Sequence, residues 1–193
     1  MTTFRLLLLL GLFVALPSST VAQEGVVSRQ EALKAVFQDA AVTRDRVILT
    51  PDQMNAVASL ARVGMQGKIF PRYVARRGED VVGRAYIDTH TAKTERQSVL
   101  VSLDRDGRVL RVDVTVFFEP AQYMAPQDFL RQYDGVVLHE ELVIRRGIRP
   151  IAGASFTGRA VNNAVRRVLA LDQVLQRAVP VSYTHLRAHE TLR

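Results

Sequence analysis

Residues 98–118, SVLVSLDRDGRVLRVDVTVFF, decide the class of fold. Apolar side chains recur at alternate positions on both sides of Asp104–Gly107, which has the composition of a tight Asp-Gly turn. This stretch predicts one hairpin, and a similar pattern around Gly78-Glu79-Asp80 predicts another just before it. The four expected strands are Ile69–Arg77, Val81–Thr89, Ser98–Leu103 and Arg108–Phe118. Two consecutive hairpins make an antiparallel meander sheet.

Helical patterns flank this sheet. Ser28 and Glu31 have the spacing of a capping box, and the apolar positions that follow predict a helix over Arg29–Ala40. A second helix begins after Thr50, with Pro at its first position, and keeps its apolar period to about Arg62. The other expected elements are a short strand at Val42–Leu49, a short helix at Pro126–Tyr133, an edge strand at Leu142–Ile144 and a last helix at Gly158–Arg177. Because helices flank a run of strands, the expected fold is a single α+β domain.

The first 22 residues have the order of a secretory signal peptide. Arg5 precedes an apolar run over Leu6–Leu16, and small residues end at Ala22. We expect cleavage after Ala22, so that an exported, periplasmic protein begins at Gln23. A helix needs about 20 apolar residues to span a bilayer, and this run is much shorter. A retained membrane anchor is therefore the less favoured alternative.

The last thirteen residues are interpreted as a sequencing artefact. The string VSYTHLRAHET at 181–191 has no amphipathic period, and codons that encode it resemble the transposase adapter of shotgun sequencing libraries. We therefore exclude 181–193 from the fold and assign the folded domain to 23–180. His185 and His189 lie in the excluded segment, so their spacing is not read as a metal site.

Composition excludes several classes of protein. The chain has no Cys, which rules out a disulfide scaffold, a cysteine zinc finger and an iron–sulfur cluster. Its formal net charge is +7, and a positive excess remains in 23–180 after both ends are removed. The basic residues are scattered without interleaved aromatics, so we expect no nucleic-acid partner. An anionic small ligand or an acidic partner fits this charge better.

The segment Ile151–Arg159 carries the strongest functional signal. Gly153 and Ala154 have little or no side chain, so a ligand can come close to the backbone. Ser155 and Thr157 are candidate caps of the last helix, whose first N–H groups attract a phosphate. Simple capping of the helix is the alternative that needs no ligand.

This segment also resembles a known motif. Ala152–Thr157, followed by Arg159-Ala160-Val161, is similar to the Ser-Gly-Ala-Thr-x-Thr-Ser motif of the FMN-binding domain family. That family includes the covalent-flavin subunits of the sodium-pumping NADH:quinone reductase and of the Rnf complex. The resemblance extends over most of 28–175 and implies that 23–180 is an FMN-binding domain. It implies that a flavin transferase esterifies the FMN phosphate to Ser155. Ala152 and Arg149 depart from the family pattern, so non-covalent FMN is the alternative.

Other residues are candidates for flavin contacts. His90, at a predicted strand end, could hydrogen-bond the flavin ring or be structural. Phe156 could stack on the ring, and the same holds for aromatic residues that alternatively belong to the core: Tyr73, Phe117 and Phe118. Further candidates are a loop over the ring, formed by Glu119, Pro120 and Tyr123, and cations for the phosphate, namely Arg145, Arg146 and Arg149.

The expected function is that of an exported FMN electron carrier with a membrane-bound or periplasmic redox partner. In such a protein the flavin supplies the redox chemistry, and the chain supplies position and anchoring. Two alternatives stay open: a flavin-free periplasmic binding module of the same fold, and a small flavin reductase.

Deleting 181–193 is predicted to leave folding unchanged, because an adapter-derived segment has no evolved packing partners. The measurement is thermal unfolding of the full and shortened chains. A fall in Tm of several degrees, equivalent to about 1 kcal/mol for a domain of this size, would show that the tail is native.

Overall fold

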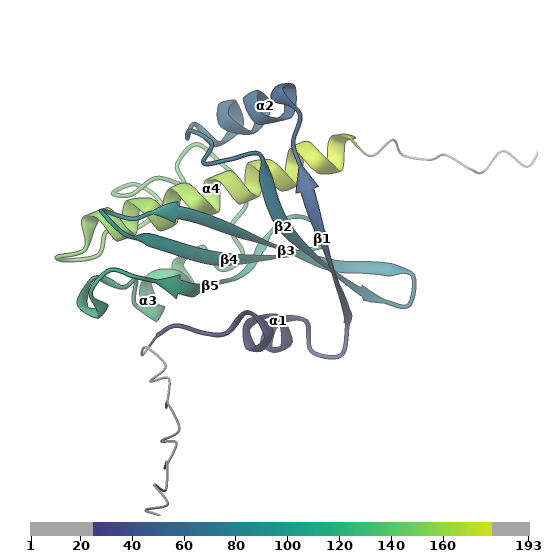
Figure 1. Cartoon of the computed structure of the whole chain (residues 1–193), viewed down its shortest axis with the longest axis horizontal. Coiled ribbons are helices and arrows are strands. Elements are labelled where there is room, and N and C mark those ends of the chain that lie inside the picture. The colour runs from purple at the N-terminus through teal and green to yellow at the C-terminus, as the bar shows by residue number, and fades with distance from the viewer. Residues whose placement is uncertain (1–24, 179–193) are drawn as a thin grey trace, which may run out of the picture.

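A five-stranded antiparallel sheet forms the centre of the molecule (Figure 1). Its strands follow the chain in the order β1 (Ala41–Ile48), β2 (Ile69–Arg77), β3 (Asp80–Thr91), β4 (Arg96–Asp104) and β5 (Val109–Phe117). The α-helices are α1 (Arg29–Phe37), α2 (Pro51–Ala61), α3 (Gln127–Leu130) and α4 (Ser155–Ala178). The computed structural model describes residues 25–178, so the predicted signal peptide and the 181–193 tail lie outside it.

The α+β class and the meander are confirmed. Every strand pairs with its neighbour along the chain, and β2 has the predicted bounds. Three expectations are wrong: the end of the first helix, the strand at Leu142–Ile144, and the start of the last helix, which begins at Ser155 rather than Gly158. The first helix ends at Phe37 rather than Ala40, because Gln38 turns to a φ of 48°. Leu142–Ile144 forms no strand; the segment folds on itself through a single bridge between Ile144 and Ile148.

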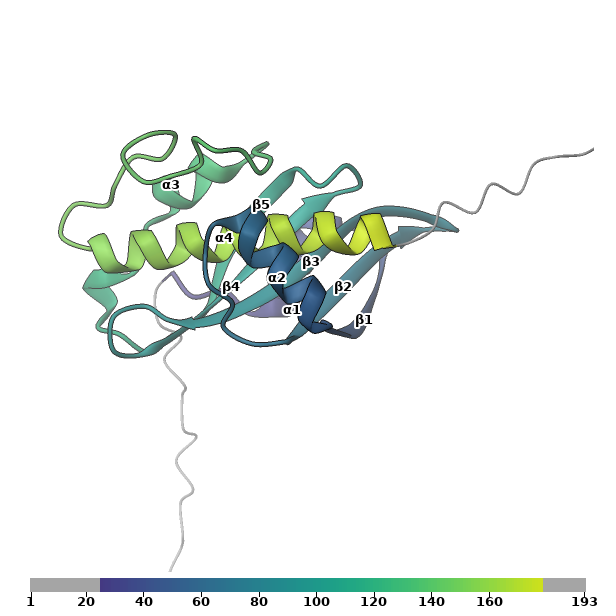
Figure 2. The same cartoon turned by 90° about the horizontal axis from the view of Figure 1, so that it is seen from above.

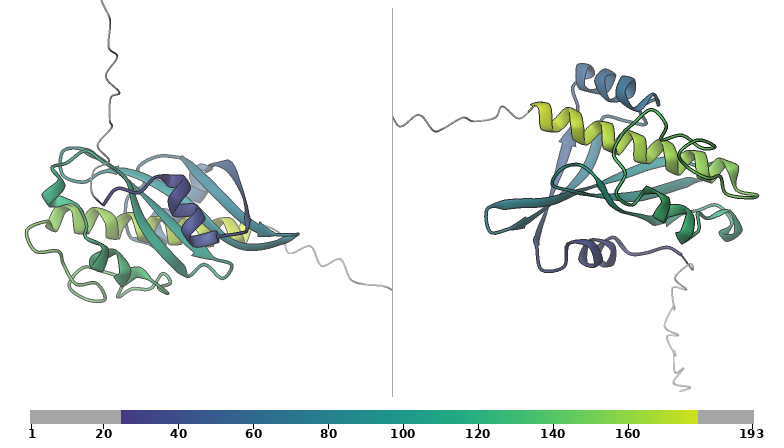
Figure 3. Two further views of the ribbon diagram at one scale, coloured as in Figure 1. Left: turned by 90° about the horizontal axis from the view of Figure 1, so that it is seen from below. Right: turned by 180° about the vertical axis from the view of Figure 1, so that it is seen from behind.

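Helices cover the two faces of the sheet unequally. Figures 1 and 2 show α2 and α4 lying across one face, where they enclose the larger apolar core. On the other face lies α1, which Figure 3 shows in front of the strands when the molecule is seen from below. It packs Leu33 and Phe37 against Tyr73, Ala85 and Leu100. A helix of nine residues is only about 13 Å long, so α1 covers part of this face.

Both N-terminal helices begin with the caps expected from the sequence. The Ser28 hydroxyl accepts from the Glu31 N–H at 3.2 Å, and the Glu31 carboxylate accepts from the Ser28 N–H. Thr50 and Gln53 form the same reciprocal arrangement ahead of α2. These bonds satisfy backbone donors that a helix start leaves unpaired.

Two buried ion pairs of opposite polarity bind α4 to β3. Arg167 of α4 donates two hydrogen bonds of 2.8 Å to the Asp88 carboxylate of β3. In the second pair the charges are exchanged, because Arg84 of β3 donates to Asp172 of α4. Tyr86, which lies between Arg84 and Asp88 in the sequence, also donates its hydroxyl to Asp172, at 2.7 Å. Bidentate pairs of this kind fix both the distance and the orientation of the two elements.

The Asp88 carboxylate remains charged because of its partners. Burial alone would raise the pKa of Asp88, but hydrogen bonds from Arg167 and His90 outweigh burial and lower this pKa. A lowered folded-state pKa means that Asp88 stabilises the fold above the ordinary aspartate pKa of about 3.9. That contribution is lost as the pH falls through the folded-state pKa, which makes the pair a source of acid sensitivity.

Removing Arg167 is predicted to destabilise the protein severely at neutral pH. Arg167→Met leaves Asp88 buried without its main partner, and we expect a loss of about 3–5 kcal/mol in the free energy of unfolding, measured with urea. The Asp88→Asn/Arg167→Met double variant should lose less than the sum of the two single variants.

The exposed pair between Arg62 and Glu140 provides the matched control. Arg62→Met should cost less than about 1 kcal/mol, because surface ion pairs contribute little. Equal losses for Arg62→Met and Arg167→Met would contradict the assignment of the buried pair as the main link between α4 and β3.

Candidate functional site

The start of α4 lies earlier than the sequence pattern suggested. The helix begins at Ser155, and its first intrahelical bond runs from the Gly158 N–H to the Ala154 carbonyl at 3.0 Å. Neither predicted cap is therefore one: Ser155 is the first residue of the helix, and Thr157 lies inside the first turn and is buried. The polar sequence around 155–158 has little apolar periodicity, which is why the pattern placed the start too late.

Gly153 gives the chain the turn that precedes the helix. Its φ is +73°, in the left-handed region that glycine adopts without strain. Ala154 follows with its small side chain buried, so the backbone reaches the helix without a bulky group over it. The N–H groups of the first turn have no acceptor within the helix and carry its positive dipole end.

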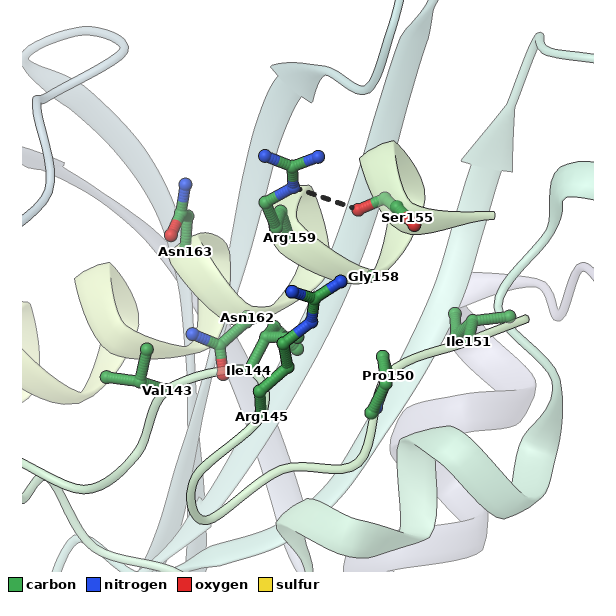
Figure 4. Close-up of a pocket in the computed structure, with 10 residues that line it drawn as sticks. All are labelled: Val143, Ile144, Arg145, Pro150, Ile151, Ser155, Gly158, Arg159, Asn162 and Asn163. Atoms are coloured by element: carbon green, nitrogen blue, oxygen red, sulfur yellow. Dashed lines mark hydrogen bonds between the residues drawn. The ribbon is translucent and has the colours of Figure 1, made fainter. Parts of the chain in front are cut away.

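A cleft of about 430 Å³ opens beside Ser155 (Figure 4). One wall is apolar and comes from the loop before α4, with Val143, Ile144, Pro150 and Ile151. The opposite wall is the first two turns of α4, with Ser155, Arg159, Asn162 and Asn163. The cleft thus offers an apolar surface opposite a row of hydroxyl, amide and guanidinium groups.

Two arginines bring positive charge to this cleft. Figure 4 shows Arg145 rising from the loop toward the first turn of α4, while Arg159 lies on the helix and donates to the Ser155 carbonyl at 3.3 Å. Neither forms an ion pair within residues 25–178. Arg145 has a φ of 71°, a costly conformation for a residue with a side chain. Strain of this kind is frequent at ligand sites.

The other two arginines proposed for a phosphate are engaged elsewhere. Arg146 forms an exposed ion pair with Glu141 at 3.4 Å, and the Arg149 guanidinium donates from Nε to the Gln132 side chain at 3.4 Å. The cleft's own cation Arg159 was quoted in the motif but given no role from the sequence. Its position one helical turn after Ser155 was the available signal.

Buried polar groups of α4 hold the loop wall in place. The Leu142 carbonyl accepts from Asn162 at 3.3 Å and from Arg166 at 2.8 Å. Arg166 also donates to the carbonyls of Ala61 and His139, so one side chain ties the loop and the end of α2 to α4. The cleft is therefore framed before any ligand binds.

A smaller cleft of about 200 Å³ lies on the other side of the same turn. Its walls include Lys93, Tyr123, Gly153 and Thr157, together with the Phe156 ring. Phe156 is 55% exposed. Two cations lie near its ring, one that lines the large cleft and one that lines the smaller cleft. Arg159 lies 5.3 Å from the ring centroid and Lys93 lies 6.0 Å from it, within the range of cation–π attraction.

Glu119 anchors the loop that carries Lys93. Its Oε1 atom accepts from the backbone N–H groups of Lys93, Thr94 and Glu95, at 3.2, 2.6 and 2.8 Å. These bonds, those from Thr94 and Glu95 above all, lower the pKa of Glu119. Three converging N–H groups are an anion-binding nest, and here the chain fills the nest with its own carboxylate.

The remaining candidates lie away from the large cleft. His90 is buried with its Nδ1 2.8 Å from Asp88 and lines neither cleft, which agrees with the structural alternative. Tyr73 and Phe117 belong to the core. Phe118 points outward at the end of β5. Among the predicted polar contacts, Ser155 and Arg145 reach the large cleft, while Gly153, Ala154, Phe156 and Thr157 line the smaller one.

Comparisons with known proteins return no relative. No protein-family model matches the chain, and no curated protein matches it significantly. Within residues 25–178, no group of three or more His, Asp or Glu side chains is arranged to hold a metal ion. No helix in that range is both long and apolar enough to cross a membrane. The case for a ligand therefore depends on the two clefts and the helix start.

Glu119→Ala is predicted to loosen the loop at 93–95, because three backbone N–H groups lose their acceptor. Amide hydrogen exchange of Lys93, Thr94 and Glu95 should become markedly faster while the exchange of β3 and β4 amides stays the same. Glu79→Ala is the control, since the Glu79 side chain is exposed in the β2–β3 turn. Unchanged protection at 93–95 would show that Glu119 does not hold this loop.

Proposed function

We propose that this protein binds FMN in the large cleft and serves as an exported electron-transfer protein. The observation that carries the proposal is the position of the Ser155 hydroxyl at the mouth of this cleft, on the first residue of α4. The motif resemblance assigns the flavin phosphate to that residue, and the geometry supports a phosphate there for reasons independent of the resemblance.

The phosphate would bind at the α4 start. The unpaired N–H groups and the helix dipole attract an anion, and Arg145 and Arg159 add two charges that no carboxylate of residues 25–178 neutralises. Gly153 and Ala154 border the same turn from the smaller cleft and place no bulky side chain over it.

The walls of the cleft fit a flat ring with one apolar and one polar end. Val143, Ile144 and Ile151 offer apolar contact. Asn162 and Asn163 offer amide groups that can both donate and accept hydrogen bonds. Bound FMN would supply the redox chemistry, while the chain supplies anchoring and a cationic surrounding.

Ser155 is also the hydroxyl available for a covalent link. In forming the ester, the Ser155 oxygen bonds to the phosphorus of an activated flavin phosphate held by a flavin transferase. The hydroxyl proton and the donor's leaving group depart. The exposed start of the helix gives such an enzyme access to this side chain, and serine has the same nucleophilic group as the family threonine.

Ser155→Ala is predicted to abolish flavin that survives acid precipitation, because the acceptor oxygen is removed. Ser155→Thr should retain it. The measurement is flavin absorbance of protein exported from a host that has the transferase. Thr157→Val is the matched control: it removes a hydroxyl two residues away that faces the smaller cleft, and it should keep the flavin.

Non-covalent binding is tested by titrating the protein with FMN and following flavin fluorescence. Arg145→Ala should weaken binding by about tenfold or more, as expected for losing a charged hydrogen bond to phosphate. Arg146→Ala, outside the cleft, should not. If no variant and no wild-type preparation binds flavin, the flavin-free binding module becomes the better reading.

A further inference from the structure

The sheet face that carries α1 has an open part beyond the helix. Val47 and Phe70 belong to the core beneath α2 and α4, so their neighbours Ile48 and Ile69 point to the opposite face. Phe117 also belongs to that core, so the next residue, Phe118, points to the opposite face of the sheet. We call this region the open face; its members are Ile48, Ile69, Thr89, Ser98, Val116 and Phe118.

Large apolar side chains are strongly exposed there. Ile48, Ile69 and Phe118 are 62%, 50% and 59% exposed, and Ile48 pairs directly with Ile69 across β1 and β2. Between Ile69 and Phe118, Thr89 of β3 pairs with Ser98 of β4, and Ser98 pairs with Val116 of β5. None of these residues belongs to the apolar cluster under α1. Exposed apolar groups gathered on one face mark an interaction surface more often than scattered ones do.

The charges around the open face are positive. Arg44 and Arg46 alternate with Asp45 and Val47 along β1, which places both arginines on the same face as Ile48. Arg96 of β4 is next to Phe118, whose N–H donates to the Arg96 carbonyl at 3.1 Å. None of the three arginines forms an ion pair within the described part of the chain.

The N-terminal end of the described chain lies on the same side. Residues 25–28 run beside α1 on this face of the sheet, as Figures 1 and 3 show. They are fixed there by the Val27 N–H, which donates to the Val114 carbonyl at 3.0 Å. The described chain therefore begins on the side of the sheet that carries the open face.

We propose that the open face is a peripheral docking surface for an anionic lipid bilayer. Ile48, Ile69 and Phe118 enter the boundary between headgroups and acyl chains, and Arg44, Arg46 and Arg96 contact the anionic headgroups. This is the arrangement by which amphipathic surfaces bind membranes, with apolar insertion and electrostatic attraction acting together. The flavin cleft lies on α4, across the sheet, and stays open to solvent. The proposal does not depend on flavin binding.

The test is co-sedimentation of the chain from Gln23 onward with vesicles of phosphatidylglycerol and phosphatidylethanolamine. We expect binding that weakens with added salt and is weaker still with phosphatidylcholine vesicles. Ile48→Ser/Ile69→Ser should reduce binding at least about tenfold, because two inserted side chains are lost. Arg46→Glu/Arg96→Glu should remove the preference for anionic lipid.

Leu110→Ser is the matched control, since Leu110 is 42% exposed but lies in the groove beside α3. It should bind as the unaltered chain does, and circular dichroism should give the same folded signal for all variants. Absence of binding, or equal binding by Ile48→Ser/Ile69→Ser, overturns the proposal. So does a dimer in light scattering that Ile48→Ser/Ile69→Ser dissociates, because a second copy would then cover the face. Each assay uses flavin-free protein, so failure here leaves the FMN proposal untouched.

Discussion

The pairing of α4 with β3 is the constraint on which the rest of the structure depends. Asp88 faces Arg167 and Arg84 faces Asp172. Each element carries an arginine followed by an aspartate, so both pairs form only when α4 and β3 run in opposite directions. If α4 slid along the strand or ran the other way, like charges would meet in a buried layer. Apolar packing alone would tolerate several positions of a helix striped with Val, Leu and Ala. The ion pairs select one of them.

The geometry of the candidate site follows from this position of α4 on β3. α4 is 24 residues long, and its position on β3 determines where its first turn lies relative to the surrounding loops. Arg166 and Asn162 then hold the loop that forms the facing wall, and Glu119 holds the loop on the far side of Phe156. Two clefts result, one on Ser155 and one on Phe156, and a cation from each lies near the Phe156 ring.

Local patterns were sufficient to predict most of this fold. Alternating side chains predicted the meander, and the capping residues at Ser28 and Thr50 predicted two helix starts, because each signal lies within a few residues of the element it defines. The same logic failed at Leu142–Ile144, where an apolar triplet resembles a strand but packs as a loop under Asn162 and Arg166. A rule based on neighbouring residues does not include hydrogen-bond partners that lie about twenty residues further along the chain.

The sequence predicted some residues of the candidate site but not how they are arranged in space. The small-residue turn and the Ser155 hydroxyl could be read from the chain, whereas the division of neighbouring residues between two clefts depends on helix phase. Lys93 carried no signal of its own, and the only signal for Arg159 was its position one helical turn after Ser155. Only the position of the Phe156 ring gives them a shared role.

The order of synthesis gives the buried pairs a further consequence. Arg84 and Asp88 leave the ribosome 88 and 79 residues before their partners on α4, so a nascent chain has no means of neutralising them inside a core. The sheet cannot close until nearly all of residues 25–178 are present. If the first 22 residues direct export as predicted, the late arrival of these partners keeps the polypeptide unfolded during transport, and the stable form is reached only afterwards.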